Sequence, residues 1–178
     1  MKFGVGYYSL QSPPHNPRGH RDLYPEMLDE ISLADQMGFD SAWLTEHHFL
    51  EDGYCPSSLV AAAAIAARTK NVRIGTGVLL MPLHDPVRIA EDAAVVDLIS
   101  GGRLILGLGL GYRQEEFSAF GRALKERKGR MEESIEILQK GWADEPFSFD
   151  GKYYKLENTS ITPKPIQKPI PIWIGAFT

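Results

Sequence analysis

Strand-like apolar segments alternate with amphipathic, helix-like segments from the N-terminus to about residue 110. The strand-like segments cover residues 3–8, 41–45, 71–82 and 103–109, and helix-like segments at residues 23–37, 58–68 and 86–100 separate them. A parallel strand that is buried on both faces reads as a continuous apolar run, and a helical crossover leads to the start of the next strand. The alternation therefore predicts an α/β fold with a parallel sheet covered by helices on at least one face.

The pattern changes after residue 110. Residues 115–120 and 126–142 are expected to form helices, and Asp150-Gly151 between two aromatic-rich arms predicts a β-hairpin over residues 147–154. A proline-rich segment at residues 162–171 then leads into a fifth core strand at residues 170–175. We expect residues 1–178 to form a single domain, in which residues 112–168 are a region inserted after the fourth strand.

Five strands and four crossovers are fewer than a complete (β/α)₈ barrel contains, and such a barrel typically needs about 250 residues. The 178-residue chain is therefore expected to be either an open sheet complete in itself or the first part of a barrel whose remainder lies outside it. In a truncated barrel, the strands at both edges of the sheet lack a neighbour.

The composition argues against several classes of partner. The net charge is −4 and no run of Lys or Arg occurs, so nucleic acid is not expected to bind. The apolar stretch from Leu59 to Ala67 is far shorter than the ~20 residues of a membrane-spanning helix, so no membrane association is expected. The single cysteine, Cys55, cannot form an intramolecular disulfide and no secretory leader is recognisable, which together predict a cytoplasmic protein.

The second strand ends in Glu46, His47 and His48, and ionisable groups at the end of a buried strand are expected to face a cavity. Adjacent strand residues point to opposite faces, so at most one of the two imidazoles can face that cavity while strand geometry persists. An imidazole titrates near neutral pH and can give or take a proton. Glu46 is expected either to orient His47 or to cap a neighbouring turn.

Two glycines interrupt the third strand in Gly75-Thr76-Gly77-Val78. Glycine weakens a strand, so this segment is either a plain bulge or a place where a flat ligand approaches the backbone. The later Gly107-Leu108-Gly109-Leu110-Gly111 lacks the third glycine of a dinucleotide-binding loop, which argues against a Rossmann fold.

No metal site is predicted. The remaining histidines, His15, His20 and His84, lie in expected loops without His or Cys partners at ligand spacing.

Several segments, taken in order, resemble one family. They are Thr45-Glu46-His47-His48-Phe49, Ile74-Gly75-Thr76-Gly77-Val78, the segment from His84 to Asp92, Ser100-Gly101-Gly102-Arg103, and Pro171-Ile172-Trp173-Ile174-Gly175. Their order and spacing are similar to those of the bacterial luciferase-like monooxygenases, which are flavin-dependent (β/α)₈-barrel oxidoreductases. The resemblance matches the N-terminal part of that barrel.

The resemblance implies an enzyme that uses reduced FMN and O₂ to oxidise a small organic substrate, with reduced flavin coming from a separate reductase. It implies a catalytic role for His47, a cis peptide bond between Gly77 and Val78 beside the flavin, and a homodimer. The helices at residues 59–67 and 86–100 are the candidate dimer contact, because small residues permit close packing, and Glu46 is a second candidate catalytic residue beside His47. The candidate cofactor-binding residues are Thr76, Gly77, Val78, Gly109 and Tyr112. Two alternatives stay open: hydride transfer with a deazaflavin coenzyme, and a non-catalytic subunit or fragment that binds a partner but no flavin.

Overall fold

The computed structural model describes residues 1–12, 14–15 and 17–175 of the chain. Its centre is a five-stranded sheet in the order β1-β2-β3-β4-β7, in which every neighbouring pair is parallel. The strands are β1 (Gly4–Tyr8), β2 (Ser41–Leu44), β3 (Arg73–Thr76), β4 (Leu104–Leu108) and β7 (Ile172–Ile174). The predicted α/β class and parallel sheet are therefore confirmed.

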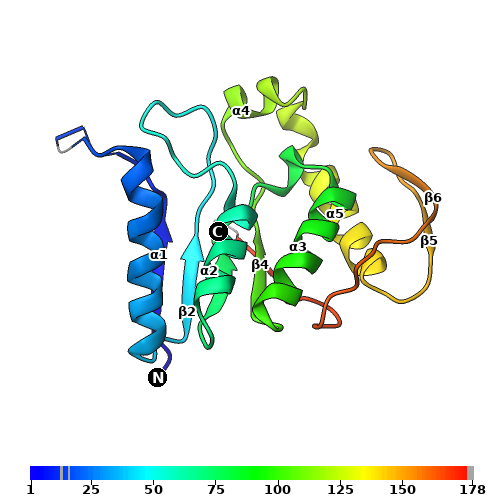
Figure 1. Cartoon of the computed structure of the whole chain (residues 1–178). Helices are drawn as coiled ribbons and strands as arrows, with labels where there is room; N and C mark the ends of the chain where they lie inside the picture. The colour runs from blue at the N-terminus through cyan, green and yellow to red at the C-terminus, as the bar shows by residue number, and fades with distance from the viewer. Residues whose placement is uncertain (13, 16, 176–178) are drawn as a thin grey trace.

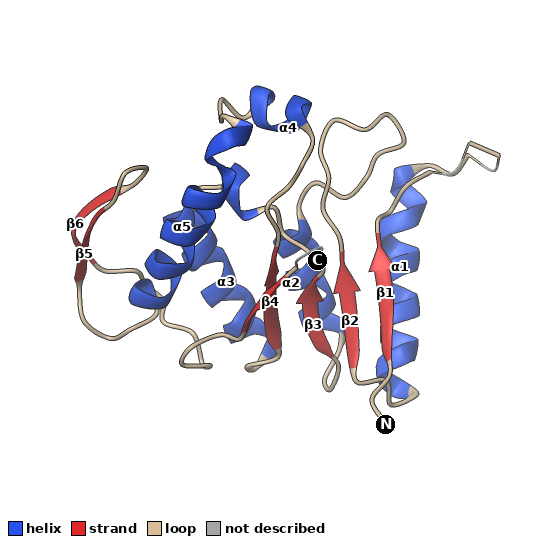
Figure 2. Ribbon diagram, turned by 180° about the vertical axis from the view of Figure 1, so that it is seen from behind, coloured by secondary structure: helices blue, strands red, loops and turns tan. Residues whose placement is uncertain are grey.

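Four helices connect consecutive strands of this sheet. They are α1 (His20–Gln36), α2 (Ser58–Arg68), α3 (Pro86–Ser100) and α5 (Arg127–Gly141). Helices α1, α2 and α3 lie on one face of the sheet, in front of it in Figure 1 and behind it in Figure 2, and α5 packs beside α3. This is the arrangement of consecutive βα units in the wall of a (β/α)₈ barrel, in which the helices lie outside and the opposite sheet face lines the interior.

The start and stop signals of α3 show how sequence determines a helix here. The Asp85 carboxylate accepts hydrogen bonds from the backbone N–H groups of Val87 and Arg88 at 2.9 and 3.2 Å. Pro86 occupies the first helical position, where no N–H donor is needed, and Gly101 ends the helix in the left-handed region at φ 67°. Between these ends the apolar side of α3 packs into the main core.

The face of the sheet opposite the helices is shaped around one indole ring. Trp43 of β2 lies between two glycines of the neighbouring strands, because a Cβ atom at Gly75 would collide with the ring and one at Gly6 would lie 2.9 Å from Trp43 Cβ. On the same face, the centroids of the Trp43 and Trp173 rings are 5.1 Å apart. The glycines in these strands therefore make room for tryptophan on the interior side of the partial barrel wall.

Two predicted strand segments differ from the structure. β3 ends at Thr76 rather than near residue 82, because the backbone leaves the sheet at the cis Gly77–Val78 peptide bond and Leu79 forms only an isolated bridge with Leu108. The hairpin is formed by β5 (Phe147–Asp150) and β6 (Lys155–Thr159), so the segment 152–154 is part of the turn rather than a strand arm. The reason is Glu133 of α5, whose carboxylate accepts hydrogen bonds from the backbone N–H groups of Lys152, Tyr153 and Tyr154.

The remaining short elements are α4 (Gln114–Ala119) and the 3₁₀ turns η1 (Met81–Leu83) and η2 (Leu124–Glu126). Helix α4 lies above the ends of the strands, as Figure 2 shows. In the part of the chain that the structure describes, no helix has both the length and the apolar character to cross a bilayer.

Candidate functional site

The carboxyl ends of the parallel strands bring the candidate residues to one edge of the sheet. Leu44 of β2 pairs with Thr76 of β3, so His47 and Gly77 follow the two strands at the same edge. The second and third strands therefore open onto a common edge. In (β/α) barrels this edge carries the functional groups.

A cavity of about 210 Å³ opens at this edge on the interior face of the sheet. Its lining residues come from β2, β3, β4 and β7 or follow these strands directly: Trp43, Thr76, Gly77, Val78, Gly107, Trp173, Ile174 and Gly175. We call this cavity the strand-end hollow. Three of the five predicted cofactor-binding residues, Thr76, Gly77 and Val78, line it.

The walls of the strand-end hollow are apolar and partly bare backbone. The Gly77–Val78 peptide bond is cis, as the family resemblance implied. A Cβ atom at Gly107 would collide with the carbonyl oxygen of Thr76, and one at Gly175 would lie 2.8 Å from Val78 Cγ1. The hollow therefore has the flat, close walls that a planar ring can contact.

Thr76 and Gly109 hold together the segments that form the wall of the hollow. The Thr76 hydroxyl donates a hydrogen bond of 2.7 Å to the carbonyl oxygen of Gly107, so this buried side chain ties β3 to β4. A Cβ atom at Gly109 would collide with the Val78 side chain. Gly109, a predicted cofactor-binding residue, lets Val78 pack closely against the chain after β4.

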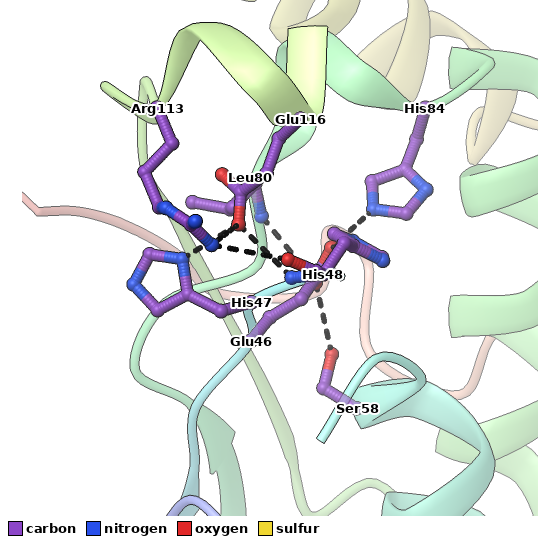
Figure 3. A network of polar contacts seen from close by, with 8 residues as sticks. All are labelled: Glu46, His47, His48, Ser58, Leu80, His84, Arg113 and Glu116. Carbon is purple, nitrogen blue, oxygen red and sulfur yellow. Dashed lines mark hydrogen bonds and ion pairs between the residues drawn. The ribbon is translucent and has the colours of Figure 1, made fainter. Parts of the chain in front are cut away.

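His47 is held beside the strand ends by a carboxylate from α4. Its Nδ1 lies 2.8 Å from Oε1 of Glu116, which is fully buried. The same oxygen accepts a hydrogen bond from the backbone N–H of His48 at 2.9 Å and lies 3.6 Å from the Arg113 guanidinium, as Figure 3 shows. Because Oε1 is already an acceptor, Nδ1 carries the proton, and Nε2 of a neutral His47 is left to accept one.

Aromatic rings surround His47. The rings of Tyr54 and Tyr112 meet the imidazole edge-on, with centroid distances of 4.8 and 5.6 Å. Tyr112, a predicted cofactor-binding residue, is 67% exposed and contacts His47 rather than the strand-end hollow. The structure thus forms two neighbouring groups at one edge of the sheet, the hollow and the His47 cluster.

Glu46 points to the helix-covered side of the sheet. Its Oε1 lies 2.9 Å from His48 Nε2 and 2.6 Å from His84 Nε2 (Figure 3). Burial raises the pKa of the Glu46 carboxyl, but the hydrogen bonds and charges of His48 and His84 outweigh this effect and leave the pKa below its usual value. Of the two roles expected for Glu46, orienting His47 is wrong, because Glu116 takes that position. The other role is supported, since Oε2 of Glu46 accepts a hydrogen bond of 3.4 Å from the backbone N–H of Leu80 at the start of turn η1.

His84 also differs from expectation, because it does have partners of metal-ligand type. It belongs to a group with Glu46 and His48 whose ligand atoms all lie within 4.8 Å of one another. Glu46 and His84 line a second cavity of about 220 Å³, which reaches between the first turns of α2 and α3. We call this cavity the interhelix cavity.

Three residues of the site were not singled out as catalytic or cofactor-binding in the sequence: Glu116, Trp43 and Trp173. Glu116 lies 69 positions from His47, so no local pattern connects them. One signal was available, since Glu116 precedes a buried Phe117 in a short amphipathic helix and is itself buried. A carboxylate on the apolar side of a helix needs a polar partner.

Comparison with known proteins agrees with this geometry. Residues 1–178 match the sequence model of the luciferase-like monooxygenases. An F420-dependent glucose-6-phosphate dehydrogenase of Amycolatopsis mediterranei is 38% identical over 166 residues, which cover 89% of this chain and 48% of that protein.

Two solved structures have the same fold and higher coverage. The monooxygenase RslO1 from Streptomyces bottropensis is 33% identical with a TM-score of 0.91, over 98% of this chain and 53% of that one. The oxygenating constituent of 3,6-diketocamphane monooxygenase from Pseudomonas putida, solved in complex with FMN, is 26% identical with a TM-score of 0.85, over 98% and 51%.

The chain thus spans about half the length of the relatives that it matches. Its five parallel strands form a partial (β/α)₈ barrel, as expected from the sequence. By fold, by strand-end geometry and by sequence, this chain belongs to the luciferase-like monooxygenase family.

Proposed function

We propose that this chain is the cofactor-facing part of a flavin-dependent monooxygenase that uses reduced FMN and O₂ on a small organic substrate. The observation that carries the proposal is the strand-end hollow, which lies at the same sheet edge as an imidazole held by a buried carboxylate. A family relative with the same fold, the 3,6-diketocamphane monooxygenase constituent, is described in complex with FMN.

The residues of the strand-end hollow fit a flat tricyclic ring. Trp43, Val78 and Trp173 would hold its faces and edges, and the missing side chains at Gly107 and Gly175 leave backbone for it to approach. When bound, reduced FMN supplies the electrons that activate O₂. The apolar walls would exclude water from the ring.

His47 is proposed to manage protons at the edge of this hollow. Glu116 keeps the proton on Nδ1, so Nε2 is the atom that accepts a proton from the substrate or returns it. Arg113 donates a hydrogen bond of 3.1 Å to the carbonyl oxygen of His48 and thereby holds the segment after β2 in place.

A second candidate function is hydride transfer with the deazaflavin coenzyme F420, because a relative of 38% identity is an F420-dependent glucose-6-phosphate dehydrogenase. The dependence of turnover on O₂ distinguishes the FMN-dependent function from the F420-dependent one. Turnover with FMN must stop under anaerobic conditions, whereas an F420-dependent hydride transfer continues without O₂.

The experiment that tests the proposal is a calorimetric titration of the purified chain with FMN and with F420. We expect FMN to bind more tightly, and we expect Trp173→Ala to weaken binding by up to about tenfold, the loss of an aromatic contact of roughly 0.5–1.5 kcal/mol. Phe3→Ala is the matched control, because Phe3 is an exposed aromatic residue before β1 and does not line the hollow.

The third candidate, a non-catalytic subunit, makes the opposite prediction. If neither coenzyme binds and the purified protein shows no flavin absorbance band, the enzyme proposal fails. A flavin band that survives purification excludes the non-catalytic alternative.

The proposed partners are a separate flavin reductase, which supplies reduced FMN, and a second copy of this chain. Helices α2 and α3 pack side by side and expose Val60, Val95, Leu98 and Ile99. We expect Val60→Arg to shift the protein toward monomer in sedimentation at micromolar concentration. If the wild-type chain is already monomeric at that concentration, the proposed homodimer is wrong. We place the function in a reducing cytoplasm, where the buried thiol of Cys55 stays free.

A further inference from the structure

The geometry points to a binding site for a divalent metal ion of the zinc class, formed by Glu46, His48 and His84. The site goes beyond the proposed function, because it lies on the helix-covered side of the sheet and shares no residue with the strand-end hollow. The three side chains come from separate places, the segment after β2 and the loop after η1, and the fold brings them together.

The donor set matches what Zn²⁺ binds in proteins. Two imidazole nitrogens and a carboxylate oxygen are common zinc ligands, at metal distances of about 2.0–2.2 Å. A tetrahedral ion at those distances separates its ligand atoms by roughly 3.3 Å. Oε1 of Glu46 lies 2.9 Å from His48 Nε2 and 2.6 Å from His84 Nε2, so each of these two pairs opens by less than about an ångström to admit an ion. The two imidazole nitrogens lie within 4.8 Å of each other and adjust to the same separation.

The surroundings of Glu46 orient its carboxylate for this role. The Ser58 hydroxyl and the backbone N–H of Leu80 both lie 3.4 Å from the other oxygen, Oε2. These contacts direct Oε1 toward the two imidazoles. Second contacts of this kind fix the orientation of metal ligands and tune their affinity.

The interhelix cavity gives the site a route to solvent. The side chain of His84 is 22% exposed, and both His84 and Glu46 line the cavity. The charged residues of the lining are the carboxylates of Glu46, Asp85 and Asp92 and one guanidinium, Arg88, which pairs with Asp92 at 3.0 Å. The lining is therefore negative overall and attracts a cation, and a water molecule from the cavity can serve as the fourth ligand.

In the alternative without metal, the imidazoles of His48 and His84 each donate an Nε2–H to Glu46 Oε1, and the three side chains form only a hydrogen-bonded cluster. Metal binding requires the proton of each neutral imidazole to occupy Nδ1 instead, which leaves Nε2 free to bind the ion. The two states are distinguished by adding metal to the protein.

The test is calorimetric titration of the tag-free, chelator-treated chain with Zn²⁺, together with the visible spectrum of the chain after addition of Co²⁺. We expect one Zn²⁺ per chain and Co²⁺ bands of tetrahedral intensity. His84→Gln is expected to weaken binding by at least about tenfold. His15→Gln is the matched control, because His15 is an exposed loop histidine outside the cluster.

Two results would overturn the site. One is a wild-type chain without saturable binding at one Zn²⁺ per chain, and the other is equal affinity in the His84→Gln and His15→Gln variants. Glu46→Gln supplies a second check, since it removes the anionic ligand and is expected to abolish the tetrahedral Co²⁺ bands. If circular dichroism shows that Glu46→Gln is unfolded, the wild-type Co²⁺ spectrum decides, because octahedral bands alone contradict the proposed ligand set.

Discussion

Glu116 Oε1 contacts His47 Nδ1 at 2.8 Å and the backbone N–H of His48 at 2.9 Å, so one buried oxygen positions both the imidazole and the chain that carries it. The second oxygen, Oε2, is buried and has no hydrogen-bond partner in the described part of the chain. The Glu116 carboxylate is therefore fixed through Oε1 alone. This makes Glu116 the positioning residue on which the proposed role of His47 depends.

Glu116→Gln is expected to change the tautomer of His47. The amide oxygen can take the place of Oε1 for both donors, but the amide lacks the negative charge that favours a proton on Nδ1, so Nδ1–H is no longer the only favoured state of the ring. The measurement is the ¹⁵N spectrum of the histidine rings, which distinguishes the tautomers and needs no cofactor. In the FMN-dependent reaction the same variant should lose about 10–100-fold in turnover.

Glu115→Gln is the control for this experiment, because Glu115 is the exposed neighbour of Glu116 on α4. A His47 ring spectrum that is identical in the wild type and in Glu116→Gln would contradict the assigned role.

Asp35 is expected to make stability depend on pH. Its carboxylate accepts backbone hydrogen bonds from Lys70, Asn71 and Val72 and thereby fixes the loop between α2 and β3. Burial raises the pKa of Asp35, but these bonds and the charge of Arg103 lower it by more, so the pKa in the folded protein lies below its usual value.

A lowered pKa means that the ionised form stabilises the fold above the unfolded-state pKa of about 3.9, and that this contribution is lost as the pH falls through the lower folded-state value. Asp35→Asn should therefore cost about 1–3 kcal/mol of unfolding free energy at pH 7, and the difference from wild type should shrink below about pH 4. Urea denaturation across this pH range measures both. Asp29→Asn, at an exposed ion pair with Arg68, should change the free energy by less than about 1 kcal/mol, and a pH-independent cost of Asp35→Asn would refute the argument.

Gly75→Ala is expected to destabilise the sheet, because the new methyl group collides with the indole ring of Trp43. Overpacking of this kind costs about 1–3 kcal/mol, measured as a shift of the denaturation midpoint. Replacing Trp43 with Leu in the Gly75→Ala chain should recover part of the lost stability, because it removes the clashing ring. If the loss came only from a change in β-propensity at position 75, the second substitution would recover nothing. Gly19→Ala is the control, since its Cβ would lie 3.6 Å from the nearest atom, the carboxylate oxygen Oδ2 of Asp22.

Glu133→Ala is expected to loosen the turn of the hairpin. Three backbone N–H groups, those of Lys152, Tyr153 and Tyr154, lose a charged acceptor at 2.8–3.1 Å, at a cost of roughly 1–3 kcal/mol. Hydrogen exchange of the Tyr153 and Tyr154 amides should accelerate, while the amides of β4 stay protected. Glu132→Ala, one residue earlier and largely exposed, should leave all of these rates unchanged.

The strands and helices were accessible from the sequence because each has a local signal: an apolar run, a cap, or a glycine stop. The alternation that separates His47 from His48 also places Glu46 on the same side as His48, and the prediction that Glu46 orients His47 did not use this signal. The contact of Glu116 with His47 was not accessible, because it joins the end of β2 to a helix that follows β4, and only the three-dimensional path of the loop fixes that distance. The turn of the hairpin was misplaced for the same reason, since its acceptor lies on α5.

The packing of Trp43 against Trp173 gives the protein an optical signal of its own. Two of its three tryptophans line the strand-end hollow, whereas the third, Trp142, is buried in the main core with its indole N–H on the carbonyl oxygen of Ala90. A flat ring bound in the hollow would lie against Trp43 and Trp173 and quench their fluorescence by contact, an effect that Trp142 in the main core would not share.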